Sequence, residues 1–121
     1  MLHLIVQPIY FNAIKTGIKT VEGRLYDQDL KNLIVEQNIC FVSSDTHEKI
    51  VCTITALTVY PDFLAMLVGE GIDAMLPGVT HLADGVAIYE SFPGYKEGVR
   101  TVGALAIRIA PYLKRFPIRN E

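Results

Sequence analysis

The distribution of hydrophobic residues along the chain predicts five β-strands. Residues 19–25 are predicted to form a strand by alternation, with Thr20, Glu22 and Arg24 on one face and Val21, Gly23 and Leu25 on the other. Residues 49–60 form the longest apolar run and are rich in Val, Ile and Thr, which favour strands. The predicted strands cover residues 2–6, 19–25, 39–42, 49–60 and 102–109.

Helical spacing of apolar residues occurs between these strands. Pro8 opens a helical pattern that Gly17 ends, so residues 8–16 are predicted to form a helix. Residues 27–33 are predicted as a short helical turn. Residues 61–92 then form a helical insert before the last strand.

Within the helical insert, Gly and Pro separate the individual helices. The predicted breaks are Gly69–Gly71 and Pro77–Gly78. Thr80 is the predicted N-cap of a last helix that runs to about Phe92. Residues 94–98 are predicted to be a loop.

The predicted order of elements is β-α-β-(α)-β-β-α-α-β, which indicates an α+β fold. A short polar turn joins the strands at 39–42 and 49–60, so they must pair antiparallel. Strict β-α-β alternation is absent, and neither a GxGxxG loop nor a Walker loop occurs. We expect one domain over residues 1–121, a strongly curved mixed sheet or small barrel with helices on its flanks.

The composition is that of an ordinary globular domain. Half of the 121 residues are hydrophobic, which is enough for a core without disulfides or metal. No signal peptide pattern opens the chain and no apolar run is long enough to cross a bilayer, so we expect a soluble, cytoplasmic protein that does not bind membranes. His3, His47 and His81 are scattered, and neither a metal site nor a cofactor is expected.

The two cysteines lie in apolar, strand-like runs. Cys40 and Cys52 are equidistant from Thr46, the middle of the polar turn between them. In an antiparallel hairpin centred on Thr46 they would lie opposite each other. We therefore expect two adjacent, buried and reduced thiols.

The net charge of −2 argues against general nucleic-acid binding, but the charge is unevenly distributed. Residues 1–26 carry +2, residues 98–121 carry +4 and residues 27–97 carry −8. We expect the first, second and last strands to be neighbours, which would join the terminal segments into one basic face. RNA affinity would then fall steeply with salt. The alternative is a solvated surface with uneven charge.

Residues 19–25 carry polar side chains that suit a nucleotide. The Lys19 ammonium suits a phosphate or a carbonyl oxygen, and the planar Arg24 guanidinium suits a phosphate or a base edge. Glu22 can accept from an exocyclic amine or a ribose hydroxyl. Tyr10 is close in sequence and is a candidate for stacking on a base. The alternative is an ion pair between Glu22 and Arg24 that holds no ligand.

Several segments of the chain resemble a known family. Residues 17–24, Gly-Ile-Lys-Thr-Val-Glu-Gly-Arg, resemble the G-x-K-x-x-E-x-R signature of ASCH domains. Residues 36–41 resemble the family segment that ends G-D-x-I-x-F, and residues 103–107 resemble its closing G-x-x-A-I strand. Residues 60–89 resemble the helical insert of bacterial, archaeal and viral members. The resemblance covers residues 3–110.

This resemblance implies a PUA-like fold, a small mixed β-barrel with flanking helices. It also implies a cleft lined by the signature residues that holds RNA or a modified nucleoside or nucleotide. The residues expected to bind such a ligand are Lys19, Thr20, Glu22, Arg24 and Tyr10. We expect a monomer or a weak dimer.

Two departures from the family pattern change these expectations. Glu36 and Gln37 replace the Gly-Asp of the middle segment, so the tight turn that this Gly allows is expected to differ. The relatives that hydrolyse N-acetylated cytidine carry a Thr nucleophile where this chain has Glu22. A carboxylate at this position should keep Lys19 charged, which does not suit a catalytic base.

Three classes of function remain open. Binding of RNA or a nucleotide in the signature cleft is the one we expect. The second is hydrolysis of a modified nucleoside such as acetylcytidine, or of RNA. It would use Lys19 and Glu22 as catalytic residues, with Thr20 as a further candidate. The third is a protein-interaction module that uses the helical insert.

Overall fold

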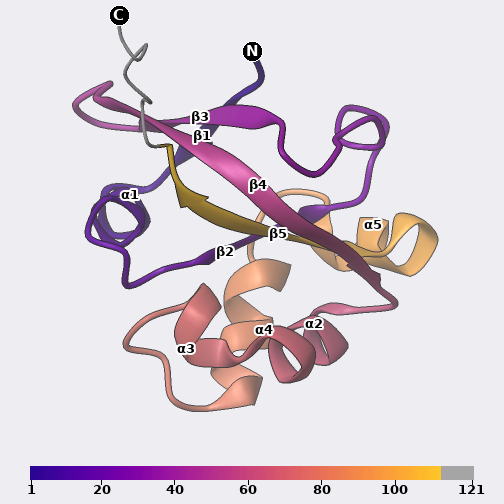
Figure 1. Ribbon diagram of the computed structural model, residues 1–121. Coiled ribbons are helices and arrows are strands. Elements are labelled where there is room, and N and C mark those ends of the chain that lie inside the picture. Colours follow the sequence, from indigo (N-terminus) through magenta and orange to yellow (C-terminus); the bar gives the residue numbers. More distant parts are fainter. Residues whose placement is uncertain (113–121) are drawn as a thin grey trace, which may run out of the picture.

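The computed structural model describes residues 1–112, and these residues form five strands and five helices (Figure 1). The strands are β1 (His3–Val6), β2 (Val21–Leu25), β3 (Asn38–Ser43), β4 (Lys49–Tyr60) and β5 (Ala104–Pro111). The helices are α1 (Pro8–Lys15), α2 (Phe63–Glu70), α3 (Ile72–Met75), α4 (Leu82–Glu90) and α5 (Tyr95–Val102). All five predicted strands and the first predicted helix are confirmed.

The five strands form one mixed sheet in the order β1-β3-β4-β5-β2. β1 is parallel to β3, and every other pair is antiparallel. A register shift between Ile54 and Ala56 interrupts the pairing of the long β4 with β5, and such irregularities bend a strand. The sheet curls into a half-barrel, with α1 beside it and α2, α3 and α4 below it in Figure 1. This is the α+β arrangement expected of a PUA-like fold.

Two hydrophobic cores lie on the two faces of this sheet, and β5 contributes to both. Leu105, Ile107 and Ile109 point into the first core, which α1 helps to fill. Ala104 and Ala106 point into the second core, where small side chains leave room for the helical layer. Residues 104–109 thus alternate between the two faces of β5. The second core consists of Val21, Phe63, Met66, Leu67, Met75, Leu76, Tyr89, Val99, Ala104 and Ala106.

Three details of the predicted helices are wrong. Residues 94–98 are not a loop, because α5 begins at Tyr95 after Gly94, whose φ of 79° ends the preceding segment. Thr80 is not an N-cap, since α4 begins at Leu82. The predicted helical turn at residues 27–33 is a series of hydrogen-bonded turns. Gly and polar residues concealed the helical spacing in α5.

The predicted neighbours of β1 are also wrong. β2 does pair with β5, as expected, but β1 pairs with β3 at the opposite end of the sheet. Alternation specifies which face of a strand is buried and leaves its neighbour undetermined. Leu4 and Val6 reach the first core from this position just as they would from another.

The cysteines do not face each other. The register pairs Cys52 with Ile39 and Cys40 with Val51, so the hairpin is centred between Asp45 and Thr46 rather than on Thr46. Because adjacent residues of a strand point to opposite faces, the two thiols lie on opposite faces of the sheet. Both are free and buried, as expected, and burial raises the pKa of Cys52 to about 11.

The turn before β3 has a backbone conformation that favours glycine, although Glu36 occupies it. Glu36 has a φ of 75°, and its N–H donates to the Ile54 carbonyl at 2.7 Å. The Gln37 side chain accepts from the Ile34 N–H at 3.1 Å. The turn therefore keeps a left-handed residue despite the loss of the Gly-Asp pair.

Candidate functional site

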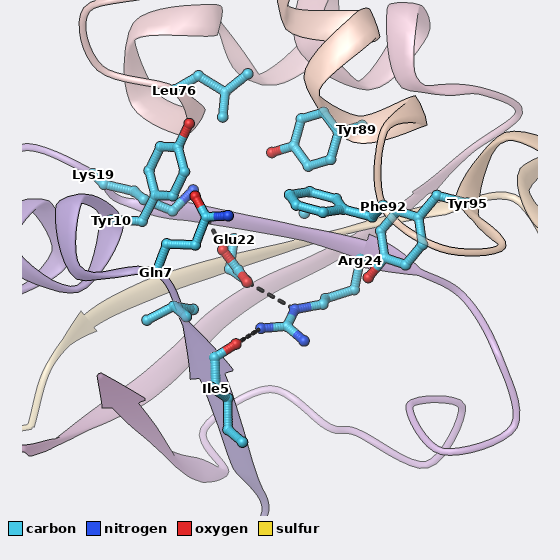
Figure 2. Close-up of a pocket in the computed structure, with 12 residues that line it drawn as sticks. Ile5, Gln7, Tyr10, Lys19, Glu22, Arg24, Leu76, Tyr89, Phe92 and Tyr95 are labelled. Atoms are coloured by element: carbon cyan, nitrogen blue, oxygen red, sulfur yellow. Dashed lines mark hydrogen bonds and ion pairs between the residues drawn. The ribbon is translucent and has the colours of Figure 1, made fainter. Parts of the chain in front are cut away.

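A pocket of about 230 Å³ lies between the signature strand β2, the β1–α1 segment and the helical layer (Figure 2). The β1–α1 wall consists of Ile5, Val6, Gln7 and Tyr10. The helical wall consists of Leu76, Tyr89, Phe92 and Tyr95. The signature contributes Lys19, Glu22, Gly23 and Arg24. Pockets for drug-sized ligands occupy roughly 300–1,000 Å³, so this one suits a group of about the size of one base or nucleoside.

Lys19 is buried in this site, and protein groups surround its ammonium. Its Nζ donates to the Val21 carbonyl at 2.7 Å and to the Met75 carbonyl at 2.5 Å. It also lies 3.4 Å from Glu22 Oε1. Two of the three ammonium N–H groups therefore donate to carbonyls, and the ion pair with Glu22 accounts for the remaining side of the ammonium. Burial lowers the pKa of Lys19, and the Glu22 carboxylate opposes this change. Lys19 therefore joins β2 to the end of α3 and holds Glu22 in place.

Glu22 is a buried carboxylate between two cations. Its Oε2 accepts from Arg24 Nε at 2.8 Å, while Oε1 faces Lys19. Burial alone would raise the pKa of Glu22, but Lys19 and Arg24 outweigh it and lower the pKa below its ordinary value. Each carboxylate oxygen can accept a second hydrogen bond. Glu22 is thus a fixed negative charge that can still accept from a ligand.

Arg24 connects the two edges of the half-barrel. Its Nε bonds Glu22 on β2, and its Nη2 donates to the Ile5 carbonyl on β1 at 2.9 Å. A guanidinium has five N–H groups, so three remain after these two bonds. The side chain is 21 % exposed, compared with 2 % for Lys19. Arg24 therefore has donors available at the accessible side of the pocket.

Aromatic rings form most of the helical wall. Tyr89 stacks on Phe63 with ring centroids 5.2 Å apart, and its edge contacts Phe92 at 6.3 Å. Phe92 and Tyr95 are also packed edge to face, at 5.4 Å. On the other side, the Tyr10 ring lies 5.5 Å from Lys19 Nζ. Figure 2 shows the rings of Tyr10, Tyr89, Phe92 and Tyr95 around the space above Glu22 and Arg24.

The structure brings Lys19, Glu22, Arg24 and Tyr10 together in this pocket, but not Thr20. Thr20 is exposed outside the lining, and its N–H donates to the Ala74 carbonyl at 3.0 Å.

The other residues that line the pocket were not predicted as site residues. They are Ile5, Val6, Gln7, Gly23, Leu76, Tyr89, Phe92 and Tyr95. Tyr89 and Phe92 occur in a helical pattern that is typical of a core, and α5 was not predicted. No local sequence pattern therefore distinguishes these residues of the pocket wall from ordinary core residues.

The described part of the expected basic face is largely neutralised. Lys15 pairs with Glu48 at 2.6 Å, and Lys19 and Arg24 share Glu22. Arg108 pairs with Glu70 at 2.8 Å. The predicted contributions of Lys114, Arg115 and Arg119 lie outside the described residues. Every lysine and arginine of residues 1–26 is therefore paired with a carboxylate.

Residues 1–112 contain neither a candidate metal site nor a candidate membrane span. No three His, Cys, Asp or Glu side chains in this part of the chain are grouped so that they could hold a metal ion. None of the helices described there is both long and apolar enough to cross a membrane.

Solved structures resemble this chain over most of its length. The crystal structure of the hypothetical protein PH0355 is 32 % identical, with a TM-score of 0.83, and the match covers 92 % of this chain and 98 % of that one. The solution structure of protein PF0455 from Pyrococcus furiosus is 28 % identical, with a TM-score of 0.72, and covers 93 % and 98 %.

A third structure shares the fold at low identity. The crystal structure of the S128A mutant of ZmASCH from Zymomonas mobilis is 14 % identical, with a TM-score of 0.59, and covers 89 % of this chain and 66 % of that one. No curated protein sequence matches the chain. The family model of the ASCH domain matches residues 4–112. The chain belongs to the ASCH domain family.

Proposed function

We propose that the pocket binds a single unpaired nucleobase, presented by a nucleoside, a nucleotide or single-stranded RNA. ASCH domains are a PUA-like family that is proposed to bind RNA. The observation that carries the proposal is the Glu22–Arg24 pair below an aromatic wall, with acceptors on Glu22 and donors on Arg24 still available. A base needs flat apolar contacts together with a few fixed polar partners, and this pocket offers both.

The charges of the site favour a ligand with few phosphates. Among residues 1–112, Lys15 is paired and Lys19 is buried, so Arg24 is the cation of the pocket lining that can contact a phosphate or ribose. Each phosphate contact on a single strand contributes a salt slope of about −0.7. Affinity for a nucleoside 5′-monophosphate should therefore fall only slightly with salt, and affinity for a nucleoside should stay almost constant.

The site favours binding over turnover of acetylated cytidine. Two carbonyls and the Glu22 carboxylate surround the Lys19 ammonium, so it is poorly placed to remove a proton from a nucleophile. The Thr20 hydroxyl, the other candidate, belongs to a residue outside the pocket. Acetylated cytidine should therefore bind without efficient release of cytidine.

Calorimetric titration tests the proposal. The ligands are the four common nucleosides, their 5′-monophosphates, a short single-stranded RNA and the same RNA as a duplex. We expect the single strand to bind and the duplex not to bind. Glu22→Gln should weaken binding at least tenfold, because it loses the fixed charge. Lys15→Met, which changes an ion pair outside the pocket, should leave binding unchanged.

Turnover is checked by incubating acetylated cytidine with the unmodified protein, Lys19→Ala and Glu22→Thr. Robust release of cytidine by the unmodified protein that is lost in Lys19→Ala would contradict the proposal of binding without hydrolysis. Equal affinity for the RNA duplex and the single strand would contradict the proposed base pocket.

A further inference from the structure

The Tyr89 hydroxyl is a buried polar group that the fold does not satisfy. Tyr89 is only 3 % exposed, and among residues 1–112 its side chain makes no hydrogen bond to a protein group. Figure 2 shows this hydroxyl pointing into the pocket above Glu22. Burial, with the Glu22 charge, raises the pKa of Tyr89 well above its ordinary value, so the phenol keeps its proton. Buried hydroxyls normally have a hydrogen-bond partner. Because the Tyr89 hydroxyl has none within residues 1–112, it is available to bond a ligand in the pocket.

Tyr60 shows how a tyrosine hydroxyl is satisfied elsewhere in this protein. Its hydroxyl donates to Glu70 Oε2 at 2.5 Å, outside the pocket. The two tyrosines therefore differ in one respect that can be measured. Removal of the Tyr60 hydroxyl breaks a hydrogen bond of the fold, and removal of the Tyr89 hydroxyl breaks none within residues 1–112.

The free edge of β2 supplies a second set of unused polar groups. The bonds from Ile109 N–H to the Thr20 carbonyl and from Tyr26 N–H to the Gly103 carbonyl show that even-numbered residues of this strand face β5. In an antiparallel pair this pattern alternates, so the odd-numbered residues direct their N–H and C=O groups to the other side. The Val21 carbonyl does so, because it accepts from Lys19 Nζ.

Gly23 is the odd-numbered residue of β2 that lines the pocket. β2 is an end strand of the sheet, so no other strand covers this side of Gly23. A Cβ placed on Gly23 would lie 2.8 Å from the Tyr89 hydroxyl, which shows how closely these two groups approach each other. The backbone of Gly23, the Tyr89 hydroxyl and the Glu22 carboxylate thus form one set of donors and acceptors at the buried end of the pocket.

We propose that the Tyr89 hydroxyl and the Gly23 backbone recognise the base-pairing edge of the ligand, an N–H beside a carbonyl oxygen or ring nitrogen. This inference rests on the proposed function and specifies how the base enters. The base N–H donates to the Gly23 carbonyl or to Glu22. The neighbouring oxygen or ring nitrogen of the base accepts a hydrogen bond from the Tyr89 hydroxyl or from the Gly23 N–H. The sugar then lies toward the more exposed Arg24. The site therefore accepts only bases whose pairing edge is free.

Two matched pairs of ligands and two matched variants test this inference. The ligands are uridine with 3-methyluridine and guanosine with 1-methylguanosine, in which a methyl group replaces the proton of the pairing edge. The methylated member should bind about 100-fold more weakly than its parent, because the methyl group leaves a buried acceptor unpaired. Tyr89→Phe should weaken binding of the parent about tenfold, and Tyr60→Phe should not change it.

Thermal melting of the ligand-free variants gives an independent readout. Tyr89→Phe should melt at or above the temperature of the unmodified protein, and Tyr60→Phe should melt below it. Equal affinity of Tyr89→Phe and the unmodified protein, or equal binding of a methylated ligand and its parent, would overturn the inference while leaving the proposed function intact. Absence of binding of any nucleoside or RNA to the unmodified protein would overturn both. A melting temperature of Tyr89→Phe as low as that of Tyr60→Phe would show that its hydroxyl serves the fold.

Discussion

Two buried carboxylates, Glu22 and Glu70, have similar partners in different surroundings. Their side chains are 9 % and 5 % exposed, and each accepts from an arginine Nε at 2.8 Å. The other oxygen of Glu70 accepts from the Tyr60 hydroxyl, and Glu70 lies outside the pocket. The other oxygen of Glu22 forms an ion pair with the buried Lys19, and Glu22 lines the pocket.

This difference shows that an ion pair on its own does not mark a functional site. The partner of Glu70, Arg108, has a side chain that is 54 % exposed, so solvent weakens that pair. Around Glu22 the cations are largely buried, and the space beside them is open to a ligand. A cavity next to an incompletely satisfied pair separates the candidate binding site from a structural contact.

Replacement of a cation from each pair should give the largest difference. Lys19→Met should lower the free energy of unfolding by about 3–5 kcal/mol, because it leaves the buried Glu22 charge with one partner fewer. Arg108→Met should cost clearly less, since its side chain is exposed and Glu70 keeps Tyr60. Chemical denaturation measures both. Equal losses would remove the distinction between the two carboxylates.

Acid titration of stability sharpens the same comparison. The pKa of Glu22 is lower in the folded protein than in the unfolded chain, because Lys19 and Arg24 outweigh its burial. Its contribution is therefore complete above the unfolded value of about 4.3 and is lost as the pH falls through the lowered folded value. Glu22→Gln should flatten this part of the curve of unfolding free energy against pH. An unchanged acid limb in Glu22→Gln would show that Glu22 is not responsible.

A methyl group on Gly23 should have a moderate effect. Gly23→Ala places a Cβ 2.8 Å from the Tyr89 hydroxyl and from Met66 Cε, so we expect a loss of about 1–3 kcal/mol from overpacking. The double variant with Tyr89→Phe should recover part of this loss, because one of the close contacts disappears. Denaturant titration of the single and double variants measures the recovery. Purely additive effects would show that the two residues do not touch.

The smallest expected effect is a gain at a distance from both carboxylates. Glu36→Gly should stabilise the protein, because glycine adopts the φ of 75° without strain. Glycine also loses more backbone entropy on folding, which reduces the net gain to about 0.5–1 kcal/mol. Thermal melting measures it, and nucleoside binding should not change. A destabilised Glu36→Gly would mean that the side chain contributes more than its backbone conformation costs.

The parts of the fold that could be predicted are those that local patterns determine. The period-two alternation of residues 102–109 identified both faces of β5, and the spacing of Glu22 and Arg24 placed them on one side of β2. The neighbour of β1 could not be predicted, because burial of Leu4 and Val6 is the same beside several strands. The cysteine register depended on a one-residue difference in the turn.

The site was predictable only in part for a related reason. Lys19 was expected to bind the ligand, but one of its N–H groups donates to the Met75 carbonyl, 56 residues away in the sequence. Tyr89 has the helical spacing of a core residue, and the pocket beside it arises from tertiary packing. Such long-range contacts leave no pattern in the local sequence.

The pairing of β2 with β5 has a consequence for the order in which the protein folds. Val21 pairs with Arg108 and Leu25 with Ala104. The strand that carries the signature therefore cannot pair until residues about 80 positions later in the chain are in place. Contacts between such distant residues close large loops and form slowly. The pocket beside the signature strand is therefore completed late in folding. During synthesis, a ligand therefore cannot assist folding until β5 has emerged from the ribosome. Ligand binding stabilises the fold only after β5 has paired with β2.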